Sequence, residues 1–253
     1  MDYSLILLVA GAVFLGSLMR STFGFGDSVV SMPLLALLPI PFSTAVALVG
    51  LVGFTVALFF AVSGWKYKDP IILKKLSIAT LFGIPFGLLL VHFANQQWIS
   101  VILGIILISY SIFSLTRSKA QDNHLEETFK NTNYSLPFGF ASGMLGSAYN
   151  MNGIPIVLYA TTRNWTPNKF MGNVQSHFII SSTFIIISHF LSGFWTKKVG
   201  IFYLSSIPAI LLAIWAGNYL YSRIDTDKFR QYVFYLIFIL GALNLIEIFN
   251  EHF

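Results

Sequence analysis

Hydrophobic residues are arranged along the chain in long runs that short polar segments separate. A membrane-spanning helix needs about 20 predominantly apolar residues. Six runs come close to that length, and they cover residues 42–63, 76–93, 98–116, 170–194, 200–221 and 231–249. Trp65, Trp98 and Trp195 stand at the ends of such runs, where amphipathic rings prefer the lipid headgroup level. The pattern predicts an all-α polytopic membrane protein in which these six runs are spans.

Two further apolar segments contain a polar interruption. Residues 3–39 are interrupted between Arg20 and Ser28, and residues 134–162 between Gly143 and Gly153. Glycine and small polar residues at this density favour an unwound backbone over a helix. Unwound backbone at membrane depth is tolerated only inside protein or against a water-filled cavity. We therefore expect two broken helices whose interruptions lie inside the protein.

The two broken segments resemble each other. An offset of 122 residues aligns Gly24 with Gly146 and Pro33 with Pro155. A broken segment followed by three clean runs then occurs twice, a pattern found in many secondary transporters. We expect a first repeat over residues 1–118 and a second over 134–253, joined by a polar linker at 119–133.

Lysine and arginine residues test the topology, because they gather on the cytoplasmic side of a membrane. If each broken segment crosses once, the flanking loops divide the basic residues nine against five. If each is a re-entrant hairpin that returns to its own side, the division becomes twelve against two. The sharper asymmetry favours six spans and two hairpins, with inverted repeats and both termini outside. Crossing once, for eight spans, remains the alternative.

Composition narrows the class of protein. The chain has 253 residues, of which 56% are hydrophobic and 10% charged, and its mean hydropathy is +0.75. A soluble domain carries roughly 25% charged residues, so a cytosolic enzyme, a nucleic-acid binder and a disordered chain are excluded. The net charge of +5 then reports orientation in the lipid bilayer, and no nucleic-acid partner is expected.

Short motifs in both breaks resemble one transporter family. Gly24-Phe25-Gly26 followed by Met32-Pro33 is similar to the glycine-rich opening motif of the TauE/SafE family, and Gly139–Gly146 followed by Asn152–Pro155 to its second copy. The resemblance extends over essentially the whole chain. Asp27 and Ser28 stand where the family pattern has further glycines. The resemblance implies a cell-membrane transporter of small sulfur-containing anions: sulfite, thiosulfate or organosulfonates such as sulfoacetate.

Arg20 is a candidate anion contact. It is a cation within an apolar stretch, where a charge costs at least about 2.5 kcal/mol, so it should face protein or water. Its planar guanidinium matches a pair of sulfonate or carboxylate oxygens. Asp27, seven residues on, offers a permanent ion pair as the alternative, and the two roles can coexist if substrate and Asp27 compete for the arginine.

Backbone and small polar groups in the breaks complete the expected substrate site. Helices that begin near Ser28 and Gly153 would point free N–H groups and positive dipole ends towards the break. Glycines would let an anion approach the backbone, and serine and asparagine side chains would add hydrogen-bond donors. The expected site residues are Arg20, Gly24, Gly26, Asp27, Ser28, Gly146, Ser147, Asn150, Asn152, Gly153, Gln175 and His177. For the glycines, tight helix packing is the alternative interpretation.

Gln175 and His177 enter this set because they lie early in the run 170–194, one turn beyond Gly172. A membrane histidine can relay protons, although it is more often a hydrogen-bonded interior residue. Asn173, Gln175 and His177 alternate, so we expect that they do not all face one way.

The sequence contains no motif that indicates an enzyme, a cofactor site or a metal site. There is no Walker sequence, no His-Glu-x-x-His motif and no cysteine, so we expect neither an enzyme nor a cofactor nor a metal site. We expect a secondary-type transporter that uses alternating access around a midplane site. An anion-selective channel and a membrane scaffold or chaperone are the alternatives. The coupling ion, proton or sodium, and association into a homo-oligomer stay open at this stage.

Overall fold

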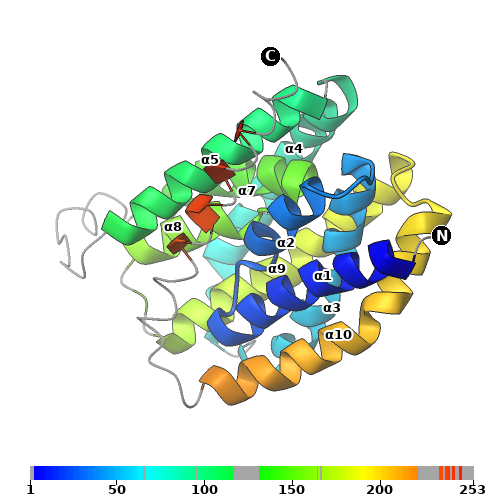
Figure 1. Ribbon diagram of the computed structural model, residues 1–253. Coiled ribbons are helices and arrows are strands. Elements are labelled where there is room, and N and C mark those ends of the chain that lie inside the picture. The colour runs from blue at the N-terminus through cyan, green and yellow to red at the C-terminus, as the bar shows by residue number, and fades with distance from the viewer. Residues whose placement is uncertain are drawn as a thin grey trace.

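The computed structural model describes residues 3–64, 67–94, 96–116, 131–163, 165 and 167–221, with short helical pieces at 234–235, 237–239, 241–242 and 245–246. Throughout these residues the regular structure is helical, as Figure 1 shows. The helices in chain order are α1 (Tyr3–Phe23), α2 (Asp27–Ala36), α3 (Phe42–Gly64), α4 (Pro70–Phe93), α5 (Gln96–Thr116), the short η2 (Thr132–Tyr134), α7 (Ser135–Tyr149), α8 (Gly153–Thr162), α9 (Pro167–Leu191) and α10 (Lys197–Tyr221).

Five of the described helices are long and apolar enough to cross a membrane. They are α1, α4 and the apolar parts of α3, α9 and α10. The all-α expectation is confirmed, and the expected runs 42–63, 76–93, 170–194 and 200–221 each fall on one of these helices. Run 98–116 coincides with α5, whose apolar stretch at Val101–Phe113 is shorter. Run 231–249 and the linker 119–133 lie mostly outside the described residues.

Helix α4 begins six residues before the expected run, at Pro70. The side chain of Asp69 accepts hydrogen bonds from the backbone N–H groups of Ile71 and Ile72, and Pro70 needs no donor at the first helical position. Lys75, expected in a loop, therefore lies on the helix, where its Nζ donates to Thr132 Oγ1 at 2.6 Å.

The first broken segment folds back on itself. Ser31 of α2 donates its hydroxyl to the carbonyl oxygen of Ala12 of α1, 3.1 Å away. A Cβ atom on Gly16 would overlap Ser31, so the absence of a side chain there permits this contact. Helix α2 thus runs antiparallel to α1. At 21 residues, α1 is about 30 Å long, whereas the ten residues of α2 extend only about 15 Å.

The second broken segment also turns back, with a shorter interruption than the sequence predicts. Helix α7 continues to Tyr149 and α8 begins at Gly153. Ser142 of α7 donates to the carbonyl oxygen of Asn152 at 2.8 Å, which holds the turn against the first helix. The prediction that Gly143 and Gly146 lie in unwound backbone is wrong, because both are helical and lie against neighbouring chain.

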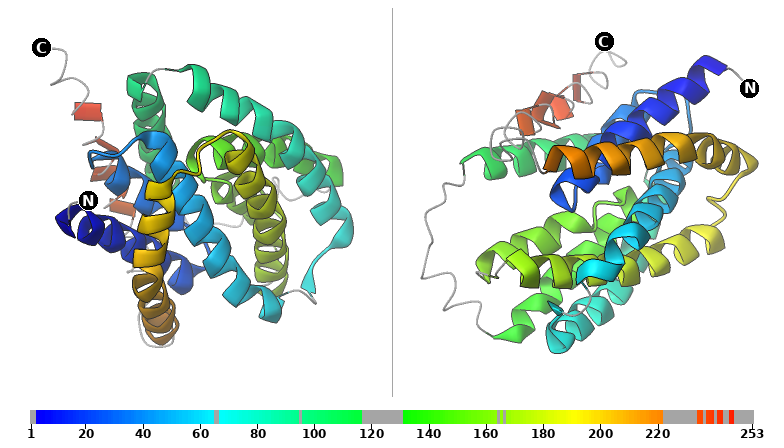
Figure 2. Two further views of the ribbon diagram at one scale, coloured as in Figure 1. Left: turned by 90° about the vertical axis from the view of Figure 1, so that its right-hand side faces the viewer. Right: turned by 90° about the horizontal axis from the view of Figure 1, so that it is seen from below.

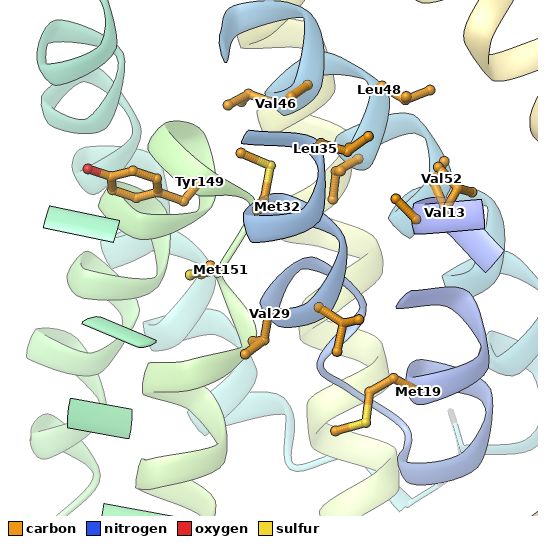
Figure 3. Packing of buried hydrophobic residues seen from close by; sticks show 14 of the residues in the cluster. Val13, Met19, Val29, Met32, Leu35, Val46, Leu48, Val52, Tyr149 and Met151 are labelled. Carbon is orange, nitrogen blue, oxygen red and sulfur yellow. The ribbon is translucent and has the colours of Figure 1, made fainter. Parts of the chain in front are cut away.

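The long helices pack in pairs that join the two halves of the chain. Helix α4 packs on α7 and α9, and α10 packs on α1 and α3. Helices α3 and α9 contact each other in the middle, between the α1–α10 and α4–α7 pairs, as the left view of Figure 2 shows. The largest buried apolar cluster joins α1, α2 and α3 to the end of α7, and Figure 3 shows Met32 of α2 in the same cluster as Tyr149 and Met151.

Candidate functional site

The first break consists of three residues, Gly24 to Gly26. Gly24 and Gly26 have φ angles of 82° and 94°, in the left-handed region that glycine adopts without steric cost. Gly26 precedes the first residue of α2, and no side chain caps this helix end. The glycine pair therefore turns the chain sharply and leaves the first turn of α2 open.

The second break depends on asparagines in place of a glycine pair. Asn150 takes the left-handed conformation at φ 57°, and its N–H donates to the carbonyl of Gly146 at 2.8 Å to close α7. Its side-chain amide donates to the carbonyl of Val46 on α3. Asn152 precedes α8 and donates from Nδ2 to Ser181 Oγ at 2.7 Å, so that no side chain caps α8 either.

The two breaks meet at one small cavity. Its volume is about 10 Å³, roughly the room of one water molecule. Its lining residues are Phe25, Gly26, Asp27, Ser28 and Val29 from the first break, Met151, Asn152, Gly153 and Ile154 from the second, and Phe178 from α9. The N-terminal ends of α2 and α8 both border this space. The partial positive charges of these two helix ends make the space suitable for an anion.

Arg20 and Asp27 form a buried ion pair beside the cavity. Arg20 Nη1 lies 2.7 Å from Asp27 Oδ2, and the arginine side chain is 3% exposed. The guanidinium also stacks over the ring of Phe178, 4.8 Å from its centroid. Its Nε and Nη2 atoms have no hydrogen-bond partner among the described residues. Asp27 lines the cavity and Arg20 does not, so Asp27 and Phe178 stand between the arginine and the space.

Gln175 connects α9 to the first break. Its Nε2 donates to the carbonyl oxygen of Gly24 at 2.7 Å in a fully buried position. The neighbouring polar residues of α9 face elsewhere. Asn173 accepts from the backbone N–H of Asp69, and His177 Nε2 lies 3.0 Å from Thr80 Oγ1 of α4. The expectation that these three do not all face one way is confirmed.

Four expected site residues lie away from the cavity, and His177 is one of them. Gly146 packs against Ile185, Ser147 donates to the carbonyl of Ile84 on α4 at 2.8 Å, and Asn150 binds α3. These contacts join helices to one another. With His177, they support the scaffold around the cavity, while Gly26, Asp27, Ser28, Asn152 and Gly153 line it and Arg20, Gly24 and Gln175 lie directly behind it.

Several residues that shape this site were not predicted, and no local pattern distinguishes most of them. Phe178 lies in an apolar run among many similar residues. No sequence pattern around it indicates that its ring lies beneath the Arg20 guanidinium. Gly53 is equally inconspicuous, although a Cβ atom there would lie 2.7 Å from Asp27 Oδ2. Phe25 and Met151 also line the cavity, and their positions inside the two interruptions are the sequence signal that could have predicted them.

Comparison with known proteins places the chain in a family. Residues 8–244, nearly the whole chain, match the family model described as Sulfite exporter TauE/SafE. No curated protein and no solved structure matches it. The family match and the apolar helices together show a multi-pass integral membrane protein with a transport function. The chain belongs to the TauE/SafE sulfite exporter family.

Proposed function

We propose that the chain is a secondary transporter of small sulfur-containing anions, which it binds between the two helix breaks and moves by alternating access. The observation that carries this proposal is the cavity that both breaks line, with the uncapped N-terminal ends of α2 and α8 at its border. Two positive helix ends converging on one buried space favour a negative ligand. Sulfite, thiosulfate and organosulfonates are the anions that the family suggests.

The described conformation is a closed one. A cavity of about 10 Å³ holds about one water molecule, whereas sulfite has four non-hydrogen atoms. The tips of the two broken segments must therefore move apart to admit an anion. If the two tips separate towards one side of the membrane and then towards the other, the site is exposed to each side in turn. Such alternating exposure is the behaviour of a carrier.

The packing of the helices supports an inverted repeat with two re-entrant hairpins. Helix α4 packs on the first helix of the other half, α7, and α10 correspondingly packs on α1. Each of these two contacts includes a glycine close to a serine: Gly87 lies against Ser147, and Gly217 against Ser21. Helices α2 and α8 have ten residues each and are too short to span a membrane of about 30 Å.

Exchange measurements test the transport function. The purified protein in liposomes should exchange labelled for unlabelled thiosulfate with saturation, as a carrier does. Sulfite and methanesulfonate should compete. Flux that rises without saturation would indicate a channel, and the absence of exchange with every anion would indicate a scaffold.

Variants of Arg20 and Asn152 test the site. Arg20→Ala should weaken binding about ten- to a hundred-fold, because a charge-assisted hydrogen bond is worth about 1.5–3 kcal/mol. Arg20→Lys should lose less, since it keeps the charge without the planar fork. Asn152→Ala should also lose less, because only a neutral donor disappears. Lys198→Ala, at an exposed position at the start of α10, is the control.

Unchanged exchange by a well-folded Arg20→Ala protein would contradict the assigned site. If that variant fails to fold, the ion pair with Asp27 is needed for structure. Neutralising both residues, by Arg20→Ala with Asp27→Ala, should then restore expression without restoring exchange.

A further inference from the structure

The charges around the cavity balance before any anion binds. Asp27 faces Arg20 of α1, Gly53 of α3, and the α8 and α9 residues that share the cavity. Among these neighbours in the described part of the chain, Arg20 is the charged one. His177 contacts Thr80 on α4, and the Nε2 atom of His189 lies 2.9 Å from the carbonyl oxygen of Ser147, so neither histidine faces Asp27. The ionised pair therefore carries no net charge.

A monoanion that entered this space would disturb the balance. Arg20 would then face two negative groups, and one buried negative charge would be uncompensated. Uncompensated charges inside proteins and membranes are costly, and buried groups neutralise to avoid them. Protonation of Asp27 restores neutrality with the groups that are already present.

We propose that Asp27 takes up one proton for each monoanion bound, so that the chain moves a sulfur-containing monoanion together with a proton. This inference rests on the proposed transport function and names its coupling ion. The proton leaves water on one side and binds a carboxyl oxygen of Asp27. It returns to water on the other side when the anion leaves, and no bond of the anion is broken.

The geometry gives each partner a role in this exchange. Asp27 is in the first turn of α2, where its negative charge interacts favourably with the helix end. An anion in the cavity would interact with the same positive helix end and would take the place of the Asp27 carboxylate there. The protonated acid would release Arg20 Nη1, and Nε and Nη2 already lack hydrogen-bond partners in the described part of the chain. The guanidinium then has a fork of donors available for the anion.

A sodium ion fits this position less well than a proton does. Hard cations require several oxygen ligands in their coordination shell. One carboxylate oxygen of Asp27, Oδ2, already binds the Arg20 guanidinium 2.7 Å away. A second cation there would be repelled by Arg20, whereas a proton removes the charge of Asp27 by a covalent bond.

Methanesulfonate is a suitable probe, because it stays a monoanion across the pH range of 5 to 8. Its affinity for the parent protein should fall as the pH rises, by up to about tenfold per pH unit, as one-proton linkage requires. In liposomes, an inward methanesulfonate gradient should acidify the lumen. The rate should be independent of a membrane potential imposed with potassium and valinomycin, because the pair carries no net charge.

Asp27→Asn should separate the anion from the proton. The variant should bind methanesulfonate with an affinity that does not change with pH, carry no protons and respond to the membrane potential. Asp27→Glu retains a titratable group and should retain proton movement. Asp69→Asn is the matched control, since asparagine caps a helix as well as aspartate does. It should leave coupling intact.

The outcomes distinguish the coupling from transport itself. Saturable methanesulfonate exchange by the parent protein without lumen acidification would overturn the coupling and leave the transport function standing. Proton movement that persists in Asp27→Asn would overturn the role of Asp27. If Asp27→Asn does not fold, the acidification and voltage measurements on the parent and Asp27→Glu proteins decide. Absence of exchange with any anion at any pH would overturn the transport function, and the coupling with it.

Discussion

Gln175 illustrates how a single side chain supports the first break. Breaking α1 leaves the carbonyl of Gly24 without a continuing helix, inside the protein and away from water. The Nε2 group of Gln175 donates to this oxygen at 2.7 Å from a helix 151 residues away in sequence. A buried carbonyl without a donor is costly, so the bond fixes both the position of the break and the rotation of α9 about its axis.

Gln175→Met should lower the free energy of unfolding by about 1–3 kcal/mol, because the volume is kept while the Gly24 carbonyl loses its donor. Anion affinity should fall as well, since the break becomes less well ordered. Thr183→Val on the same helix is the control, because the Thr183 hydroxyl donates to the carbonyl of Ile179 in its own turn, and its loss should change stability by less than about 0.5 kcal/mol. Thermal unfolding in detergent measures both, and a Gln175→Met protein as stable as the parent would contradict this role.

Small residues determine how closely the helices approach. Without a hydrophobic driving force between spans, association in lipid depends on close packing. Gly83 and Gly87 of α4 lie against the backbone of α7, and Gly139 and Gly143 of α7 lie against the backbone of α4. This contact holds the second broken segment to a helix of the first half. Gly146, the α7 glycine that was expected in the binding site, also lies against neighbouring side chains, those of Ile185 and Asn152.

Gly143→Ala should destabilise the protein by about 1–3 kcal/mol or more, because its Cβ would overlap the carbonyl oxygen of Thr80 and force the helices apart. At Gly200, in α10, a new Cβ would have no atom within 4 Å from any described residue outside its own turns of the helix. The same substitution there should stabilise the helix by up to about 1 kcal/mol. Melting temperatures of the two variants should therefore move in opposite directions. A parallel shift would rule out backbone contact as the cause.

At the scale of the whole molecule, the distribution of basic residues predicts the orientation. In the arrangement with two re-entrant hairpins, twelve lysines and arginines flank one side of the membrane and two the other. The side with twelve is then cytoplasmic, and both termini are outside. Much of the basic sequence falls outside the described residues, so the orientation stays a prediction that labelling can test.

Cysteine substitutions at Asn123 and Glu251 should react with an impermeant thiol reagent from opposite sides of the membrane. The natural sequence contains no cysteine, so each introduced thiol is the only target. Asn123 should be protected in intact cells and Glu251 should not. Labelling of both from the same side would favour eight crossings, with each broken segment crossing once.

Hydrophobicity and charge along the sequence determined the class of protein, the approximate spans and the existence of two breaks. These properties are local, because the transfer of an apolar segment into lipid depends on its own residues and not on their partners. The glycine pair at Gly24 and Gly26 likewise predicts a turn from local sequence, without knowledge of which helices pack around it. The family motifs are short stretches of chain, so they too could be recognised from the sequence alone.

The tertiary structure alone decided which polar residues meet. Hydropathy does not report how a helix is rotated, so it could not show that Gln175 faces Gly24 while His177, two residues on, faces Thr80. Nor could it distinguish Gly26, which lines the cavity, from Gly143, which packs against α4. The cavity joins residues more than a hundred positions apart. Which residues line the cavity depends on how α2, α8 and α9 pack together. The sequence of a single helix does not determine this packing.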